Sequence, residues 1–475
     1  MFILMLIIFI VGYTAIATEH NIRVDKSATA LVIGSLTWAV FILGAPTILH
    51  VDTSLSVREM LDSGTHILKS LKEYFIYHFE VPADEMPTTV THFVLDELRH
   101  HLVEISEILF FLLGAMTIVE LVDAHNGFSI ITDKIKTTNK LKLLISLSLI
   151  TFAFSAVLDN LTTAIVMSAL LKKLISDKKD LWLFAGFIII AANAGGAFSP
   201  IGDVTTIMLW IGGQITAINI IQAIVVPSLV CLAVPMLYMA VSLKGNVTRP
   251  EESEFSEHLI NPASNKEKNI IFFLGIAALL FVPIFKTITH LPPFVGILLG
   301  LGVIWVVTEL MHKSKNHEEK NLLSVVGVLR KVDVPSVLFF LGILMAVASL
   351  SSAGHLIMLA NFLEKNVGNM YVVNIIIGLL SSIVDNVPLV AGAMGMYEIG
   401  PEVAGVSYPV DHSFWEFLAY CAGTGGSCLI IGSAAGVAVM GILKIDFMWY
   451  LRRISLLALA GYLSGALVFF LENTL

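Results

Sequence analysis

The sequence predicts an all-α polytopic membrane protein built from two related halves. Hydrophobic residues make up 56% of its 475 residues and charged residues only 14%. A soluble domain of this size would not tolerate that balance on its surface. Three landmarks also occur twice in the same order, with an offset of about 230 residues, which indicates an internal repeat of a whole half.

The apolar segments fix the number of crossings. A spanning helix needs about 20 apolar residues, and the chain holds about ten such segments. From the N-terminus they lie near residues 2–17, 28–49, 102–122, 181–217, 219–242, 269–287, 290–310, 334–352, 414–447 and 449–471. No basic region precedes the first segment, and Glu19 and His20 follow it in place of a cleavage site, so we expect a retained span.

Residues 51–100 separate the second and third spans and are expected to form an external insertion. Apolar residues at helical spacing predict an amphipathic helix lying on the membrane. The histidines of this region are expected to be solvated. The apolar positions are Leu61, Ile67, Leu68, Leu71 and Phe75, and the histidines are His66, His78, His92, His100 and His101.

The repeated landmarks are an aromatic run, an Asp-Asn pair and a glycine cluster. A carboxylate at membrane depth costs roughly 2.5–3.5 kcal/mol or more, so an Asp-Asn pair placed there in both halves predicts a functional site. The matching segments are 109–112 with 338–341, Asp159-Asn160 with Asp385-Asn386, and 195–202 with 425–432.

The two Asp-Asn regions, 140–176 and 369–397, are too polar at their centres for one clean span. We expect each to be a re-entrant hairpin of two short helices whose tip carries the Asp-Asn pair. Non-helical backbone at this depth is tolerated only inside protein or beside a watery cavity. Segments 181–217 and 414–447 are long and interrupted by the glycine clusters, so we expect broken helices there.

The distribution of lysine and arginine, which prefer cytoplasmic loops, predicts that the two halves have opposite orientations. Lysines flank hairpin 140–176 on both sides, so both its ends are expected inside. Segment 398–413, which follows the second hairpin, has acidic residues but no lysine or arginine, so that hairpin's ends are expected outside. Loops 243–268 and 311–333 are basic and expected inside, which places both chain termini outside.

This pattern is that of an inverted-repeat secondary transporter, whose site lies near the membrane midplane. We therefore expect four parts. Residues 1–100 hold the N-terminal scaffold helices and the insertion, 101–243 the first repeat, 244–333 cytoplasmic loops and scaffold helices, and 334–475 the second, inverted repeat.

Oxygen donors gather at the hairpin tips and the helix breaks. Carboxylate, amide, hydroxyl and backbone carbonyl oxygens are the ligands of a small hard cation that sheds its water. Burial and a neighbouring negative charge raise the pKa of a carboxyl group, so a proton would compete with the cation for the same oxygens. The candidate cation- and proton-binding residues are Asp159, Asn160, Thr162, Thr163, Asn193, Asp203, Thr205 and Thr206 in the first half, and Ser382, Asp385, Asn386, Ser427 and Ser433 in the second.

Asp159 and Asp203 are expected to be the main titrating pair and, with Asn160, to bind the metal ion; Asp385 is a second charge centre. Simpler roles stay open for several of these residues. Asp159 and Asp385 are also good N-caps for the hairpin helices. The threonines could bond to helix carbonyls, and the glycines could serve close helix packing.

Three phrases carry a family resemblance: 159–163 (DNLTT), 192–206 (ANAGGAFSPIGDVTT) and 382–388 (SIVDNVP). Together with Gly12-Tyr13 and Glu19-His20 near the first helix, they resemble the NhaD-type sodium/proton antiporters of the ion transporter superfamily. Each phrase alone is also similar to arsenite carriers and sodium-dicarboxylate carriers of the same fold.

The resemblance implies a homodimer in the cell membrane, with a scaffold and a transport unit that moves like an elevator. It also implies exchange of Na+ or Li+ for H+, favoured at alkaline pH and serving pH homeostasis. On this interpretation Na+ is the metal ion at Asp159, Asn160 and Asp203. The expected partners are the lipid bilayer and the transported Na+, Li+ and H+, with no cofactor and no nucleic acid.

Three alternatives to cation exchange have less support in the sequence. An organic anion carried with sodium would lie beside three aspartates that repel it, and arsenite efflux finds no cysteine cluster to support it. An intramembrane aspartyl protease also needs two membrane-depth aspartates, but the break reads Pro200-Ile-Gly-Asp203, without a Gly-x-Gly-Asp motif. The inverted repeat favours a transporter over an enzyme.

Overall fold

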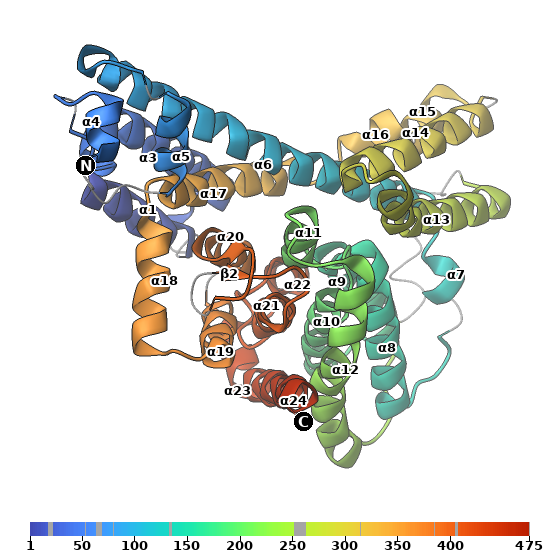
Figure 1. Ribbon diagram of the computed structural model, residues 1–475. Coiled ribbons are helices and arrows are strands. Elements are labelled where there is room, and N and C mark those ends of the chain that lie inside the picture. The colour runs from blue at the N-terminus through green and yellow to red at the C-terminus, as the bar shows by residue number, and fades with distance from the viewer. Residues whose placement is uncertain are drawn as a thin grey trace. The chain divides into compact units, whose positions relative to one another are not determined.

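The fold is described by a computed structural model, which covers residues 1–17, 22–52, 54–62, 69–78, 80–132, 135–250, 263–313, 315–383, 385–403 and 407–474 (Figure 1). The named elements of these ranges are helices, apart from the paired two-residue strands β1 (Glu398–Ile399) and β2 (Ser407–Tyr408). The all-α prediction is confirmed.

Nine helices of the described residues are long and apolar enough to cross a membrane, and a bent pair of helices would make a tenth. The predicted class of polytopic membrane protein and the predicted number of spans are therefore confirmed. Individual assignments differ. Helix α1 (Phe2–Ala17) is shorter than a full span, whereas α8 (Lys140–Leu158), predicted as a short hairpin helix, is long enough to cross alone.

Each half contains two helices joined at the Asp-Asn pair, followed by two helices separated by the glycine cluster, at the places where the hairpins and broken helices are predicted. In each half the first hairpin helix packs against the first part of the broken helix, α8 against α10 and α19 against α21. The elements are α8, α9 (Asn160–Leu174), α10 (Lys178–Ala197) and α11 (Val204–Ile211) in the first half, and α19 (Met370–Leu380), α20 (Asn386–Met396), α21 (Ser413–Gly425) and α22 (Ala434–Leu443) in the second.

Equivalent glycines explain this close packing. A Cβ atom added at Gly195 in α10 would overlap the carbonyl oxygen of Phe152 in α8, and one at Gly425 in α21 would overlap the carbonyl oxygen of Gly378 in α19. Only glycine allows backbones to approach so closely. The packing role that stayed open for the glycine clusters is confirmed.

The helices divide into two compact units. Unit 1 consists of Met1–Leu109, Val334–Gly368 and Ala391–Ser407, and unit 2 of Phe110–Asp333, Asn369–Val390 and Tyr408–Leu475, within the described ranges. In unit 1, α3 (Lys26–Ile48) packs along α17 (Val334–Ser352), where Gly34 and Gly342 face the neighbouring backbone.

The remaining helices complete the two units. They are α4 (Val57–Asp62), α5 (Lys69–Tyr77), the 3-10 helix η1 (Ala83–Glu85), α6 (Met86–Ala124), α7 (Ser129–Thr132), α12 (Ala217–Ser242), α13 (Asn265–Thr289), α14 (Pro293–Met311), α15 (His317–Leu323), α16 (Val325–Leu329), α18 (His355–Asn366), α23 (Phe447–Arg453) and α24 (Ser455–Thr474).

Two parts of the prediction for residues 51–100 are wrong, the extent of the insertion and the helix lying on the membrane, whereas its external location stays a prediction. Residues from Met86 onward belong to the long helix α6. Leu71 and Phe75 of α5 are fully buried, so the apolar face of this helix packs on protein. Ile67, Leu68 and His66 lie outside the described residues, as do Glu19 and His20.

Candidate functional site

Asp203 lies at the centre of a polar network inside unit 2 and is only 1% exposed. It is the N-cap of α11, because its Oδ1 accepts hydrogen bonds from the backbone N–H of Thr205 at 2.9 Å and from the Thr205 hydroxyl at 2.7 Å. Asn160 Nδ2 donates to Asp203 Oδ2 at 2.6 Å, and Asn386 Nδ2 lies 3.4 and 3.5 Å from the two carboxylate oxygens. Asn160 begins α9 and Asn386 begins α20, so both hairpins supply donors to one buried carboxylate.

Asn193, fully buried in α10, connects the two halves of the network. Its Oδ1 accepts from Asn160 Nδ2 at 3.2 Å, while its Nδ2 donates to Ser427 Oγ at 3.0 Å and to Ser433 Oγ at 2.9 Å. Both serines lie in the break between α21 and α22. Through Asn193, the break in the first broken helix and the break in the second belong to one network.

Ser433 occupies the position in the second half that Asp203 occupies in the first. It is the N-cap of α22, and its hydroxyl accepts from the backbone N–H of Gly436 at 3.2 Å. Both breaks therefore restart a helix with a side-chain cap, charged in the first half and neutral in the second.

Asp159 forms the joint between α8 and α9, with a φ of 73°. This left-handed region is unfavourable for residues other than glycine, and such strain is found mainly at functional positions. Its carboxylate caps α9, accepting from the backbone N–H and the hydroxyl of Thr162, both at 2.8 Å. The capping role that stayed open for Asp159 is confirmed, and the capped carboxylate is half-buried beside Asn160.

The other predicted residues are placed differently. Asp385 Oδ1 accepts from the backbone N–H of Val387 at 3.4 Å. Ser382 donates to the carbonyl of Leu379 at 2.6 Å, and Thr206 donates to the carbonyl of Ala197 at 3.4 Å, so both hydroxyls bond to helix backbone. Thr163 is buried, and its hydroxyl has no hydrogen-bond partner among the described residues.

Seven of the thirteen predicted residues thus form one continuous hydrogen-bonded network in unit 2. They are Asn160, Asn193, Asp203, Thr205, Asn386, Ser427 and Ser433. Asp159 and Thr162 bond to each other next to it, Thr206 and Ser382 bond to helix carbonyls instead, and the Thr163 hydroxyl has no hydrogen-bond partner among the described residues.

Two serines outside the candidate set hold each hairpin against its broken helix. Ser155 donates to the carbonyl of Ala192 at 2.5 Å, and Ser381 donates to the carbonyl of Ala422 at 2.8 Å. A third group that we did not predict is Glu416 of α21, which is 6% exposed and accepts from Asn219 Nδ2 of α12. The sequence did contain a signal for Glu416, because it is an acidic residue within an otherwise apolar helix.

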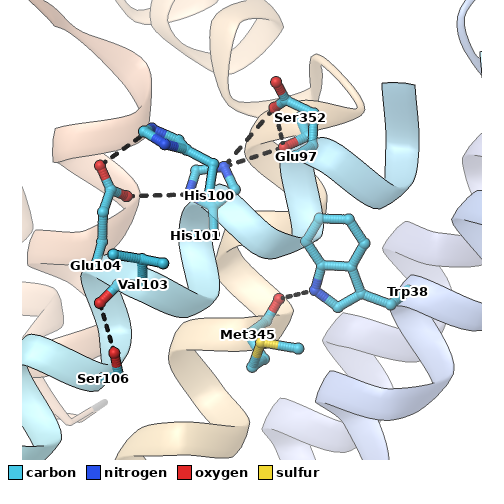
Figure 2. Close-up of polar contacts among 9 residues, drawn as sticks. All are labelled: Trp38, Glu97, His100, His101, Val103, Glu104, Ser106, Met345 and Ser352. Carbon is cyan, nitrogen blue, oxygen red and sulfur yellow. Dashed lines mark hydrogen bonds and ion pairs between the residues drawn. The ribbon is translucent and has the colours of Figure 1, made fainter. Parts of the chain in front are cut away.

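A separate polar cluster lies in unit 1 (Figure 2). The His101 ring in α6 lies 3.1 Å from Ser352 Oγ through Nε2 and 3.2 Å from Glu104 through Nδ1, and Ser352 donates to Glu97 at 2.7 Å. Trp38 of α3 donates to the carbonyl of Met345 in α17 at 2.8 Å. The expectation of a solvated His101 is wrong, because the ring belongs to the contact between α6 and α17.

A family model described as a citrate transporter (CitMHS) matches residues 4–411. The chain belongs to this family. Two relatives come from Arabidopsis thaliana. Its sodium/proton antiporter 1 is 41% identical to this chain over 97% of the chain and 71% of the antiporter's own length. Its sodium/proton antiporter 2 is 39% identical over 98% of the chain and 98% of the antiporter's own length. The Na(+)/H(+) antiporter NhaD of Vibrio parahaemolyticus is 32% identical over 74% of the chain and 86% of its own length. The resemblance to NhaD-type antiporters is confirmed. The family and these relatives also show that the protein is a membrane transporter and not an enzyme.

Proposed function

We propose that the protein exchanges Na+ for H+ across a membrane, and that Asp203 binds the two ions alternately. One observation carries the proposal. Asp203 is buried, and among the described residues its hydrogen-bond donors are the side-chain amides of Asn160 and Asn386 and the hydroxyl and backbone N–H of Thr205, none of which is positively charged. A buried carboxylate without a cationic partner is costly in its charged form. Either a proton or a metal cation would relieve that cost.

The proposed Na+ ligands are Asp203, Asn160 and Asp159. Asn160 uses its Nδ2 group for both Asp203 and Asn193, so its Oδ1 takes part in neither bond. An amide oxygen beside two carboxylates is the donor set that a small hard cation prefers. The unwound segments between α10 and α11 and between α21 and α22 would supply backbone carbonyl oxygens.

Exchange follows from competition for one carboxylate. With Na+ bound, Asp203 is charged and neutralised by the metal; with a proton bound, it is neutral and the metal is excluded. Na+ or the proton can then bind to Asp203 and cross the membrane only after the other ion has left this carboxylate. Li+, a smaller ion of the same charge, is proposed as a second cargo, and no resident cofactor is required.

An organic anion, the cargo named in the family description, is disfavoured by the same carboxylate. A carboxylate ligand placed beside Asp203 would meet negative charge in a region that excludes water, where like charges repel strongly. The relatives named as sodium/proton antiporters also favour a cation. Arsenite efflux stays an alternative to be tested.

The distribution of lysine and arginine in the loops and the internal repeat support a proposal for the arrangement of the chain in the membrane. The two halves would be inverted across the membrane, with both termini outside and four parts bounded at residues 100, 243 and 333. The hairpins and broken helices would form the moving unit of a homodimer in the cell membrane, working by an elevator-like motion.

The test is transport by the purified protein in liposomes with an acidic lumen and an internal pH-sensitive dye. Addition of NaCl or LiCl outside is expected to alkalinise the lumen, whereas KCl, sodium-free citrate and arsenite are not. Asp203→Asn should abolish the response. The matched control is Asp96→Asn, which changes an exposed aspartate paired with Arg99. A response to citrate or arsenite alone, or full Na+ response in Asp203→Asn, contradicts the proposal.

A further inference from the structure

Two histidines 187 residues apart in sequence lie against each other in unit 2. His125 directly follows α6, and His312 is the C-cap of α14. Both lie just beyond the candidate spanning segments and are 0% and 1% exposed. Their rings are nearly parallel, with centroids 5.1 Å apart and an interplanar angle of 16°. Neither histidine belongs to the Asp203 network.

The hydrogen bonds determine where the protons of this pair reside. His125 Nδ1 lies 2.7 Å from the carbonyl oxygen of Leu121, which can only accept, so Nδ1 carries the hydrogen and Nε2 of the neutral ring is an acceptor. His125 Nε2 lies 3.3 Å from His312 Nε2, which must therefore donate. The remaining His312 Nδ1 is a buried lone pair without a hydrogen-bond partner among the described residues.

An additional proton has no favourable position in this arrangement. On His125 Nε2 it would place two N–H groups against each other and break the bond between the rings. On His312 Nδ1 it would create a charged ring with a buried, unsatisfied donor, which costs more than an ordinary lost hydrogen bond. Protonation in either position weakens the contact between the ends of α6 and α14.

The neighbouring charges do little to stabilise a protonated ring. Glu267 of α13 lies 4.0 Å from His312 Nε2, but Lys315 already pairs with it at 3.1 Å. Glu309 of α14 pairs with Lys320 of α15 at 2.8 Å. Burial is the main cause that lowers the pKa of both rings, that of His125 to about 4. The hydrogen bond to the Leu121 carbonyl offsets part of this lowering for His125, and Glu267 offsets part of it for both rings.

The direction of the pH dependence follows from these shifts. The unfolded or released ring binds a proton near pH 6.5, whereas the packed ring binds one only near pH 4. The contact therefore has its full stability above about pH 6.5 and loses it as the pH falls toward 4.

We propose that the His125–His312 pair is a second proton-binding site, separate from the Asp203 network, whose protonation releases the end of α6 from α13 and α14. Helix α13 also packs against α8, the hairpin helix that ends at Asp159. This contact connects the released region to the site, so we expect release to lower the maximal transport rate. The effect on transport rests on the function proposed above; the release itself does not.

Hydrogen–deuterium exchange of the full-length protein in lipid nanodiscs tests the release without any transport. After correction for the intrinsic pH dependence of exchange, protection of peptides over 118–130 and 306–313 should fall by about 30-fold between pH 7.5 and pH 5, the factor for a pKa that moves from 6.5 to about 4. In the double variant His125→Gln, His312→Gln, protection should not depend on pH. His92→Gln, which changes an exposed histidine of α6, is the matched control and should behave as wild type.

Transport measured at saturating and at limiting Na+ then separates this site from Asp203. Proton competition at Asp203 raises the KM for Na+ at low pH, whereas protonation of the histidine pair lowers the maximal rate. The double glutamine variant should lose only the second effect. If its peptides keep the wild-type pH dependence of exchange, or if wild-type protection does not change with pH, the histidine proposal is overturned whatever the cargo proves to be.

Discussion

Replacing Asn193 by alanine should show how strongly the two halves depend on one amide. The side chain makes three hydrogen bonds, with Asn160, Ser427 and Ser433. At about 0.5–1.5 kcal/mol for each bond, the loss amounts to about 1.5–4.5 kcal/mol of stability, before any cost of the cavity. Asn374 offers a matched control, because it is equally buried in α19 but its amide donates a single hydrogen bond among the described residues, to the carbonyl of Phe414 at 3.2 Å.

The two alanine variants should also differ in cation binding. Without Asn193, the amide of Asn160 loses the neighbour that fixes its orientation toward Asp203. If that disorder costs the bound ion about 1.4–2.8 kcal/mol, the KM for Na+ rises about 10- to 100-fold, since each 1.4 kcal/mol is tenfold. Asn374→Ala should leave the KM unchanged and lower thermal stability by about a third as much as Asn193→Ala.

The assays are thermal unfolding in detergent and Na+-dependent dye dequenching in liposomes. Equal losses of stability in the two variants, together with an unchanged KM in Asn193→Ala, would mean that Asn193 is only a packing residue. The network would then have no part in ion binding.

Three further predictions concern packing, capping and unit 1. Gly195→Ala forces the backbones of α10 and α8 apart and should cost about 1–3 kcal/mol or more, measured by thermal unfolding, whereas Gly441→Ala in α22, where a Cβ meets nothing within 4 Å, should be neutral. Asp159→Asn keeps an N-cap side chain and should retain thermal stability but lose Na+-driven proton flux; retained flux would remove Asp159 from the ion site. Trp38→Phe loses the bond to Met345 and should cost about 0.5–1.5 kcal/mol by chemical denaturation, without changing the KM for Na+.

The repeat made the central part of the fold predictable. An Asp-Asn pair in an apolar segment cannot continue a lipid-facing helix without cost, so the joints at Asp159 and before Asn386 fall where the sequence places them. The breaks were predictable from the glycine clusters, because glycine destabilises the interior of a helix and allows the chain to bend. The length of α6 was not: Asp96, Glu97 and Arg99 end the apolar run, but charged residues do not end a helix.

Side-chain direction set the limit of prediction within the site. Ser382 and Ser427 both carry hydroxyls in polar segments of the second half, yet Ser382 bonds to the end of the preceding helix α19 and Ser427 to Asn193. Amphipathic spacing likewise cannot distinguish a lipid surface from a protein surface, which is why the burial of Leu71 was missed. No local sequence pattern predicts the pairing of His125 with His312, because the two residues are 187 positions apart.

The equivalent caps Asp203 and Ser433 differ in the charge that each brings to the polar network of unit 2. Duplication gave the fold two helix breaks of the same geometry, each able to hold a capping side chain at its start. Only one of them holds a carboxylate. A symmetric pair would place two negative charges at the meeting point of the halves and require two cations to neutralise them. With serine in the second break, the two caps together carry one negative charge in place of two, so divergence at a single position lowers by one the number of cations or protons that would neutralise them.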